Sequence, residues 1–292
     1  MRSHEPALTG QPGQRLSRWR LQKIIARAHA AGHVRCVGVG YLRTLRDGAA
    51  PKAAIAGSVI VAVVPCLDEE ANVAAVVTGL SAWVDRVVVA DNGSHDNTAA
   101  VAAAAGAEVV VEPRRGYGRA CHAGIRRARQ LGAQIVLFAD GDGSDDPTDA
   151  PLLLGPVQRG EVDLCLGRRS GHLIEEGAMT AVQRFGNWLA PALMRLLFRA
   201  SYHDMPPFKA IRASALYRLD LQDQSYGFTI EMLIKAHHRG LGVREVEVHH
   251  RARQGGHSKV SGTLVGSVRA AAKILTAISR HALREVRQRP AR

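Results

Sequence analysis

Between residues 58 and 167 the chain alternates short apolar runs with longer stretches of mixed polarity. The short runs are rich in valine, isoleucine and leucine, which is typical of strands that are covered on both faces. The longer stretches place their apolar residues at helical spacing. The predicted strands are 58–65, 85–91, 107–112, 134–140 and 162–167, and the predicted helices are 68–82, 96–105, 116–131 and 147–158. This alternation predicts an α/β fold in which helices cover both faces of a doubly wound, mainly parallel sheet.

Beyond residue 177 the pattern predicts two long helices with a shorter strand–helix–strand segment between them. The long helices mix apolar with basic residues, so each has either a core face and a solvent face or a face that lies on a membrane. Pro191 is expected to kink the first of them or to begin a new helix. The predicted helices are 178–199, 229–239 and 260 to about 287, and the predicted strands are 207–212 and 243–249.

The first 57 residues differ in composition from the rest of the chain. They hold ten Lys and Arg against two acids, which is a large share of the net charge of +13. We expect a basic N-terminal extension at 1–57, a main domain at 58–258, and a basic amphipathic helix with a tail at 259–292. The extension is either disordered or forms an amphipathic helix over 17–31. A basic balance suits nucleic acid, an anionic membrane surface or phosphorylated substrates.

The hydropathy of the chain predicts a globular protein without a membrane-spanning helix. Hydrophobic residues make up 46% of the chain and the mean hydropathy is −0.07. The longest apolar run, Ala53 to Pro65, has 13 residues, whereas a spanning helix needs roughly 18. The start of the chain is basic and lacks an apolar signal core, so we expect a cytoplasmic protein. The four cysteines lack the short spacing of a zinc site and are expected to be free thiols.

Four of the predicted strands end in polar clusters, at 65–70, 91–96, 112–118 and 140–142. In open α/β sheets, ligands bind at the carboxyl ends of the strands, so the four clusters together predict a site. Asp140 and Asp142 are alternate residues that would share one side of an extended chain. Two adjacent carboxylates repel unless a cation lies between them, which favours a hard divalent ion with oxygen ligands. A solvated acidic loop is the alternative.

The ordered motifs resemble those of the family 2 glycosyltransferases of the GT-A fold, and most closely those of the polyprenyl-phosphate (dolichol-phosphate mannose or glucose) synthases. The resemblance covers about residues 58–280. It rests on Pro-x-Leu-Asp-Glu-Glu, Asp-Asn-Gly-Ser-x-Asp, Glu-Pro-Arg-x-Gly-Tyr-Gly and Asp-x-Asp with Asp-Asp-Pro, and on later matches at 207–212, 226–232 and 251–259. It implies a metal-dependent, inverting transfer of a hexose from a UDP- or GDP-linked donor. The implied acceptor is a polyprenyl phosphate, and the implied location is peripheral, on the cytoplasmic face of the membrane.

Position by position, the resemblance also implies which residues bind the nucleotide. Asp91 would hydrogen-bond the base, and its acceptor-only carboxylate suits a ring N–H donor. The glycines of the third cluster would let the backbone pass close to the nucleotide, where a Cβ would collide. The nucleotide-binding residues implied in this way are Pro65, Asp68, Glu70, Asp91, Arg115, Gly116 and Gly118. Asp140 and Asp142 would hold Mg²⁺ or Mn²⁺ against the diphosphate.

The acceptor side of the site is implied by residues in the last quarter of the chain. Glu231 would be the general base for a hydroxyl acceptor, whereas a phosphate acceptor is already ionised and would only be positioned by it. The alternative is an acid that the dipole at a helix N-terminus stabilises. Arg251, Arg253 and Lys259, with Ser258, would clamp a phosphate, because guanidinium groups match phosphate geometry. A solvated basic loop is the alternative for that segment.

Three other functions compete with this interpretation. A soluble acceptor, such as a phosphorylated small molecule, would use the same donor site with Glu231 as the base. A nucleotidyltransferase would need a glycine- and lysine-rich loop after the first strand, and residues 65–70 contain none. The positive charge would also suit a nucleic-acid-binding protein. We expect no specific nucleic-acid partner, because the charge is concentrated in the extension and the sequence has no array of base-stacking aromatic residues.

Overall fold

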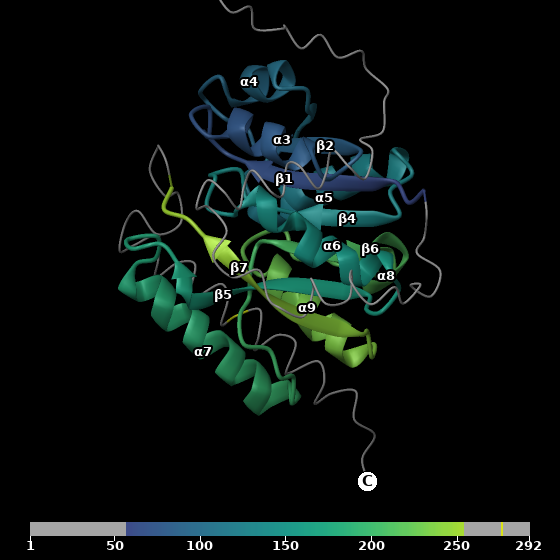
Figure 1. Cartoon of the computed structure of the whole chain (residues 1–292), viewed down its shortest axis with the longest axis vertical. Helices are drawn as coiled ribbons and strands as arrows, with labels where there is room; N and C mark the ends of the chain where they lie inside the picture. Colours follow the sequence, from purple (N-terminus) through teal and green to yellow (C-terminus); the bar gives the residue numbers. More distant parts are fainter. Residues whose placement is uncertain (1–56, 254–275, 277–292) are drawn as a thin grey trace, which may run out of the picture. The chain divides into compact units, whose positions relative to one another are not determined.

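The computed structural model of the chain describes residues 57–253 and residue 276 (Figure 1). Within these residues a seven-stranded sheet has the order β3-β2-β1-β4-β6-β5-β7. Its strands are β1 (Ile60–Cys66), β2 (Arg86–Asp91), β3 (Glu108–Val111), β4 (Ile135–Phe138), β5 (Leu164–Ile174), β6 (Lys209–Arg212) and β7 (Val243–His250). Strands β3, β2, β1 and β4 are parallel, and β7 is parallel to β5. The sheet is thus mainly parallel, as predicted.

The chain leaves β1 toward β2 and β3 and then returns to place β4 on the other side of β1. Such a reversal of strand order opens a crevice at the carboxyl ends of the two strands involved. The residues that follow β1 and β4 therefore border one crevice. They are the first and the last of the four polar clusters, at 65–70 and 140–142.

Helices cover both faces of the sheet because the strand residues alternate between two apolar cores. On β1, Val61 and Val63 belong to one core, whereas Ile60, Ala62 and Val64 belong to the other. The first core also holds residues of α5, α7, α8 and α9, and the second holds residues of α3, α4 and α6. The helices are α3 (Val73–Ser81), α4 (Thr98–Ala104), α5 (Tyr117–Gln130), α6 (Ala150–Gln158), α7 (Ala181–Phe198), α8 (Ala213–Leu219) and α9 (Phe228–His238), with a 3₁₀ turn, η1 (Pro147–Asp149), before α6.

The structure differs from the predicted elements in four places. Strand β6 pairs antiparallel with both β4 and β5, and helix α8 follows it where the pattern predicted nothing. Helix α7 continues through Pro191 without ending. Helix α3 begins at Val73 instead of residue 68, because the segment before it is tied to the start of α4: the amide of Glu69 donates to Thr98 Oγ1 at 2.7 Å. The predicted helix at 260–287 and the predicted extension at 1–57 lie outside the described residues, apart from Gly57 and residue 276.

The described cysteines Cys66, Cys121 and Cys165 are free thiols buried in the protein, as expected. Among the described residues, no helix combines the length and the hydropathy needed to cross a membrane.

Two helical glycines provide a matched test of how closely α5 packs on the sheet. A Cβ on Gly124 of α5 would overlap Cγ1 of Val63 in β1, whereas a Cβ on Gly186 of α7 would meet nothing within 4 Å. We expect Gly124→Ala to lower the free energy of unfolding by about 1–3 kcal/mol through overpacking. Gly186→Ala is expected to raise it by up to about 1 kcal/mol, because alanine is the better helix former. Urea unfolding of the two variants measures both values, and equal effects would contradict this packing.

Candidate active site

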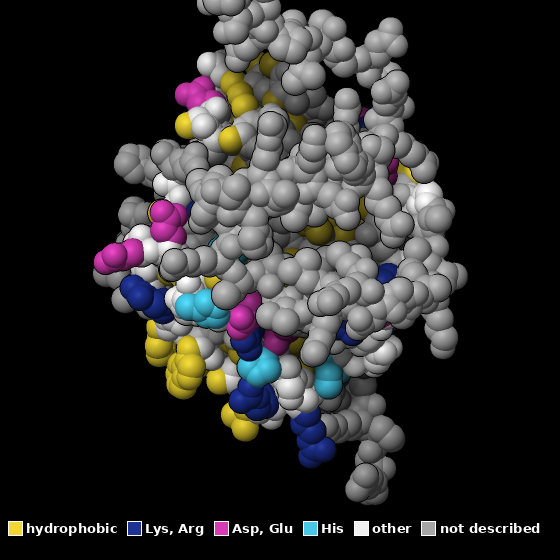
Figure 2. All heavy atoms as spheres, in the orientation of Figure 1, with side chains coloured by type: hydrophobic (Ala, Val, Ile, Leu, Met, Phe, Trp, Pro, Cys, Tyr) yellow, Lys and Arg dark blue, Asp and Glu magenta, His cyan; other side chains and the backbone are white. Residues whose placement is uncertain are grey.

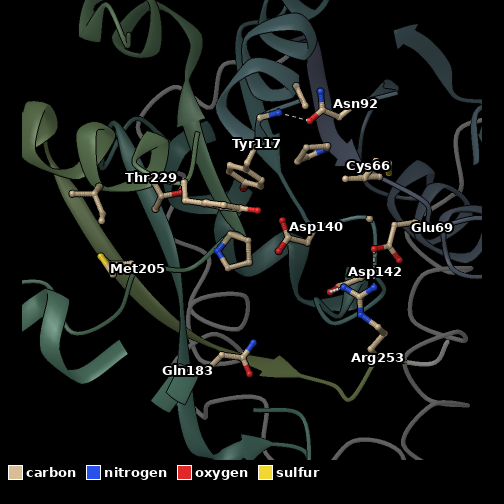
Figure 3. Close-up of a pocket in the computed structure, with 18 of the residues that line it drawn as sticks. Cys66, Glu69, Asn92, Tyr117, Asp140, Asp142, Gln183, Met205, Thr229 and Arg253 are labelled. Carbon is tan, nitrogen blue, oxygen red and sulfur yellow. Dashed lines mark hydrogen bonds and ion pairs between the residues drawn. The ribbon is translucent and has the colours of Figure 1, made fainter. Parts of the chain in front are cut away.

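A cavity of about 420 Å³ lies at the carboxyl edge of the sheet (Figure 3). Asp140 and Asp142 lie between two halves of its wall. The half that we call the sheet side is formed by Pro65, Cys66, Leu67, Glu69, Asn92, Arg115 and Gly116. The half that we call the helix side is formed by Met179, Gln183, Asn187, Met205, Pro207, Tyr226, Thr229 and Ile230. A cavity of this size, lined by both apolar and charged side chains, is large enough for a small-molecule ligand.

The loop after β4 brings a group of carboxylates to the cavity. The amide of Asp140 donates to Oδ2 of Asp145 at 3.0 Å, and the amide of Ser144 donates to Oδ1 of Asp142 at 2.9 Å. Burial, followed by repulsion from Asp142 and Asp145, raises the pKa of Asp140 well above its ordinary value. Burial also raises the pKa of Asp145 to about 7. The carboxylates are therefore held close together at an electrostatic cost that a cation would remove.

The donor chemistry of this loop fits Mg²⁺ or Mn²⁺. Asp140 and Asp142 supply the hard oxygen ligands that these ions prefer, and both line the cavity. The described residues contain no group of three His, Cys, Asp or Glu side chains that could hold a metal by themselves. An ion at this place would take its other ligands from water and from the phosphates of a substrate, which is how Mg²⁺ is commonly bound.

Arg253 lies between the carboxylates of Glu69 and Asp142, as Figure 3 shows. It donates to Oε1 of Glu69 at 2.7 Å and to Oδ2 of Asp142 at 2.8 Å. Burial raises the pKa of Glu69, and the charge of Arg253 opposes that rise. The guanidinium thus supplies positive charge at the place where the sequence predicts a metal ion and a diphosphate.

This position of Arg253 gives a prediction with two effects of opposite sign. We expect Arg253→Gln to strengthen the binding of Mn²⁺ alone by up to about tenfold, because a competing cation is removed from Asp142. The same change is expected to weaken the binding of nucleoside diphosphate by about tenfold or more, because a charge-assisted phosphate contact is lost. Isothermal titration calorimetry measures both. Arg168→Gln is the control, since Arg168 pairs with Glu247 and does not line the cavity. Weaker binding of both ligands to Arg253→Gln would contradict this competition.

The residues expected to bind the nucleotide separate into two groups. Pro65, Arg115 and Gly116 line the cavity, whereas the structure does not bring Asp68, Glu70, Asp91 and Gly118 to its wall. The carboxylates of the second group bind loop amides: Asp68 accepts from His95 at 2.7 Å, Glu70 accepts from Asn97 at 2.9 Å and Asp91 accepts from Ser94 at 3.2 Å. Asp68 and Glu70 thus join the loop after β1 to the loop after β2, and Asp91 holds the start of the second loop.

Sequence reasoning missed the neighbours of those acids, Glu69 and Asn92, which do line the cavity. Asp68 has a positive φ of 50°, so the alternation of the strand does not continue through the loop. Asn92 receives the amide of Gly116 at 2.8 Å and donates to the carbonyls of Glu112 and Arg114 at 2.9 and 2.8 Å. It therefore fixes the loop after β3 against the end of β2. Both residues stood within the quoted motifs, which is the signal that could have identified them.

The two glycines of the third cluster pack against protein backbone, beside the nucleotide role that the resemblance implies for them. Gly116 has a φ of 151°, and a Cβ there would overlap the carbonyl oxygen of Gln224. A Cβ on Gly118 would overlap the carbonyl oxygen of Asp223. The backbone that comes close to these glycines belongs to the loop before α9. This loop also accepts the amides of Gly118 and Arg119, at 3.2 Å each.

Glu231 holds the same loop and does not line the cavity. Its side chain is 2% exposed, its Oε2 accepts the amides of Gln222 and Asp223 at 2.9 and 2.7 Å, and its Oε1 pairs with Lys235 at 2.8 Å. Burial opposes ionisation of this carboxyl, but the hydrogen bonds from Lys235 and the two amides outweigh it and lower the pKa. Glu231 lies in the first turn of α9, so its contacts favour the alternative of a structural helix N-terminal acid over a general base.

The expected phosphate clamp is described only in part. Arg253 lines the cavity, whereas Arg251 pairs with Asp146, whose carboxylate also accepts the amide of Thr148 in η1. Ser258 and Lys259 lie outside the described residues. Arg169 of β5 adds another arginine to the lining of the cavity.

The helix side of the cavity was found only in part from the sequence, because the motifs at 207–212 and 226–232 contain Pro207, Tyr226, Thr229 and Ile230 but no motif covers the others. Gln183 and Asn187 of α7 line it, and their four-residue spacing places them on one face of the helix. Met205, Pro207 and Thr229 come from the segments around β6 and at the start of α9. These residues belong to elements far apart in the chain, which the tertiary fold brings to one cavity.

Comparison with known proteins shows which family the chain belongs to. The sequence model of "Glycosyl transferase family 2" matches residues 61–220. The chain belongs to this family. An uncharacterized glycosyltransferase of Mycobacterium tuberculosis is 40% identical to it over 214 residues, which are 73% of this chain and 95% of that protein. The undecaprenyl-phosphate mannosyltransferase of Micrococcus luteus is 30% identical to it, over 62% of this chain and 77% of that protein.

Solved structures agree with the family. This glycosyltransferase is similar to glucosyl-3-phosphoglycerate synthase of Mycobacterium tuberculosis, crystallised with Mn²⁺, UDP and glucosyl-3-phosphoglycerate. The two chains are 26% identical with a TM-score of 0.64, over 79% of this chain and 82% of that one. The predicted family and the GT-A fold are thus confirmed, and the expected divalent metal agrees with the Mn²⁺ of this neighbour.

Proposed function

We propose that this glycosyltransferase transfers a hexose from a UDP- or GDP-linked donor to a polyprenyl phosphate, with inversion at the anomeric carbon. It acts as a peripheral enzyme on the cytoplasmic face of the membrane, and its catalytic domain spans 58–258. The nucleotide lies in the sheet side of the cavity and the acceptor phosphate enters from the helix side. The UDP bound to the structural neighbour supports the donor class, and the name of the Micrococcus relative supports the acceptor class.

The residues of this chain have defined tasks in the proposed reaction. Asp140 and Asp142 hold Mg²⁺ or Mn²⁺, which would supply a Lewis acid for the charge on the departing nucleoside diphosphate. Arg253, released from the two carboxylates that it now joins, contributes its guanidinium to the phosphates. An oxygen of the acceptor phosphate attacks the anomeric carbon as the bond from that carbon to the diphosphate breaks. The products are a sugar phosphodiester and the free nucleoside diphosphate.

The observation that carries the choice of acceptor is the composition of the helix side. Among the described residues of this half, none is an acid or a histidine that could remove a proton from an attacking hydroxyl. The nearest expected base, Glu231, is buried and engaged with Lys235 and two amides. A phosphate monoester has a second pKa of about 6, so it is largely ionised at neutral pH and needs no base. The apolar wall of Met179, Met205, Pro207 and Ile230 suits the first isoprene units.

A soluble phosphorylated acceptor is the second candidate, because the structural neighbour is named for such a substrate. Transfer to the hydroxyl of a small phosphorylated acid would use the same donor site. That reaction needs a general base, and Glu231 would have to leave its present partners to provide one.

The test is nucleoside diphosphate release by the full chain from a panel of UDP- and GDP-hexoses with Mn²⁺ or Mg²⁺. Each donor is offered alone, with a polyprenyl phosphate dispersed in detergent, and with 3-phosphoglycerate. Release that requires the polyprenyl phosphate and yields a lipid-linked hexose is the expected result. Proton NMR of the lipid-linked hexose reports the anomeric configuration, which should be opposite to that of the donor. Release driven by 3-phosphoglycerate alone would overturn the lipid acceptor and favour the second candidate.

A further inference from the structure

Helix α7 exposes most of the large hydrophobic side chains on the described surface. Four of the six exposed large hydrophobics of the described residues belong to it: Phe185, Trp188, Leu196 and Leu197. Trp188 is 67% exposed and Leu196 is 76% exposed, so these side chains lie outside the core. The helix is nevertheless anchored to the protein, because Ala190, Met194 and Phe198 are buried in the first core. Apolar faces of this kind mark surfaces that another body covers.

The exposed residues form one stripe along the helix. Phe185, Trp188 and Leu196 are separated by three and eight residues, which places them on one face. The rings of Phe185 and Trp188 are in contact, with centroids 5.9 Å apart. We call this stripe the α7 outer face. In Figure 2, hydrophobic and basic side chains gather at the lower left, where Figure 1 places α7.

The charges beside the α7 outer face favour an anionic lipid surface over a second copy of the chain as its partner. Arg184, Arg195 and Arg199 are exposed beside the stripe, and α7 contains no Asp or Glu. A second copy of the chain, packed by two-fold symmetry on this face, would bring the three arginines toward one another. An anionic lipid surface instead pairs with them, while aromatic and leucine side chains enter the boundary between head groups and acyl chains. Arginine also lays its aliphatic stem on apolar surroundings and keeps its charge at the interface.

We propose that the α7 outer face is the membrane-docking surface of this glycosyltransferase, with the helix lying in the plane of an anionic lipid surface. The proposal deepens the proposed function and rests on it for the identity of the acceptor. Gln183 and Asn187, on the side of α7 away from the stripe, line the helix side of the cavity. Docking therefore places the acceptor end of the cavity within about one helix diameter, ~10 Å, of the lipid head groups.

The experiment is co-sedimentation of the full chain with vesicles of phosphatidylcholine alone and of phosphatidylcholine mixed with phosphatidylglycerol, without donor. We expect Phe185→Ser, Trp188→Ser and Leu196→Ser together to reduce partition into the anionic vesicles by about tenfold or more. The matched control is Trp83→Ser with Val111→Ser, which removes exposed apolar side chains elsewhere. Arg184→Gln with Arg195→Gln should weaken binding to anionic vesicles only, whereas Arg86→Gln with Arg218→Gln should not. The Arg184→Gln, Arg195→Gln variant and its control test the proposal even if the triple variant folds poorly.

Three results would overturn the proposal. The triple variant could bind vesicles as strongly as the wild type, or the wild-type chain could fail to bind vesicles at all. The third is that the wild-type chain forms a dimer in solution and only the triple substitution makes it monomeric. The last result would assign the α7 outer face to a second copy. A short, water-soluble polyprenyl phosphate separates this proposal from the proposed function, since turnover with it needs no vesicle. The triple variant should keep that turnover. If the wild-type chain turns over this substrate but does not bind vesicles, only the proposed docking surface is contradicted. If it binds vesicles through α7 but forms no lipid-linked product, only the proposed acceptor is contradicted.

Discussion

Replacing Asp140 by Asn is expected to lower the rate of hexose transfer by about 10³-fold or more while leaving the chain folded. Stabilisation of a leaving diphosphate by a bound divalent cation is worth several kcal/mol, and about 4 kcal/mol corresponds to that factor in rate. Asp140 lines the cavity between its two halves, and its amide is held by Asp145. The substitution relieves the repulsion that Asp142 and Asp145 exert on Asp140, which together with burial raises the pKa of Asp140. The variant is therefore expected to be at least as stable as the wild type.

The control for this prediction is Asp145→Asn, which removes one negative charge from the same loop. Asp145 does not line the cavity, and an Asn oxygen can still accept the amide of Asp140. We expect its rate to stay within about tenfold of the wild type, because the position of the ligand matters more than the charge of the loop. Initial rates at saturating donor and metal, with circular dichroism to check folding, measure both variants. An equal loss in the two would show that the total charge, and not the placement of Asp140, governs the reaction.

The sequence predicted the part of the site that depends on strand periodicity. Asp140 and Asp142 follow a buried strand at a spacing of two, and the parallel order of β1, β2 and β4 places their carboxyl ends at one edge. Prediction failed where the chain leaves the strand. At Asp68 a positive φ turns the backbone, so Glu69 faces the cavity while its two acidic neighbours bind loop amides. Local periodicity contains no information about such a turn.

The part of the helix side that lies outside the motifs could not be predicted, because it is assembled from tertiary contacts. The antiparallel strand β6 enters between β4 and β5, and thereby brings the segment before it, at Met205 and Pro207, to the cavity. Glu231 shows the same limit from the other direction. Its place in a motif implied an acceptor role, but the amides of Gln222 and Asp223 turn its carboxylate toward the loop that packs on Gly118. The motif thus indicated a segment close to the cavity but not the direction in which the Glu231 side chain points.

The second large effect concerns the buried ion pair between Asp204 and Arg169, which lines the cavity. Arg169 donates through Nε to Oδ2 at 2.9 Å and through Nη2 to Oδ1 at 2.8 Å, and its amide donates to Oδ2 at 3.0 Å. The two side chains are 12% and 5% exposed. Arg169→Met would leave the carboxylate of Asp204 buried without its partner. We expect the free energy of unfolding at neutral pH to fall by about 3–5 kcal/mol.

The neighbouring pair provides the control, and pH provides the signature. Arg168→Met breaks a half-exposed pair with Glu247 and should cost less than about 1 kcal/mol.

Burial alone would raise the pKa of Asp204, but the hydrogen bonds and charge of Arg169 outweigh it and hold that pKa below its ordinary value. The pair therefore stabilises the fold above that ordinary value, and its contribution is lost as the pH falls through the lowered pKa. The difference between Arg169→Met and the wild type should accordingly shrink toward acid pH, and Asp204→Leu should recover much of the loss in the double variant. Urea unfolding as a function of pH measures both, and a loss in Arg169→Met that is the same at every pH would contradict an ion pair as its cause.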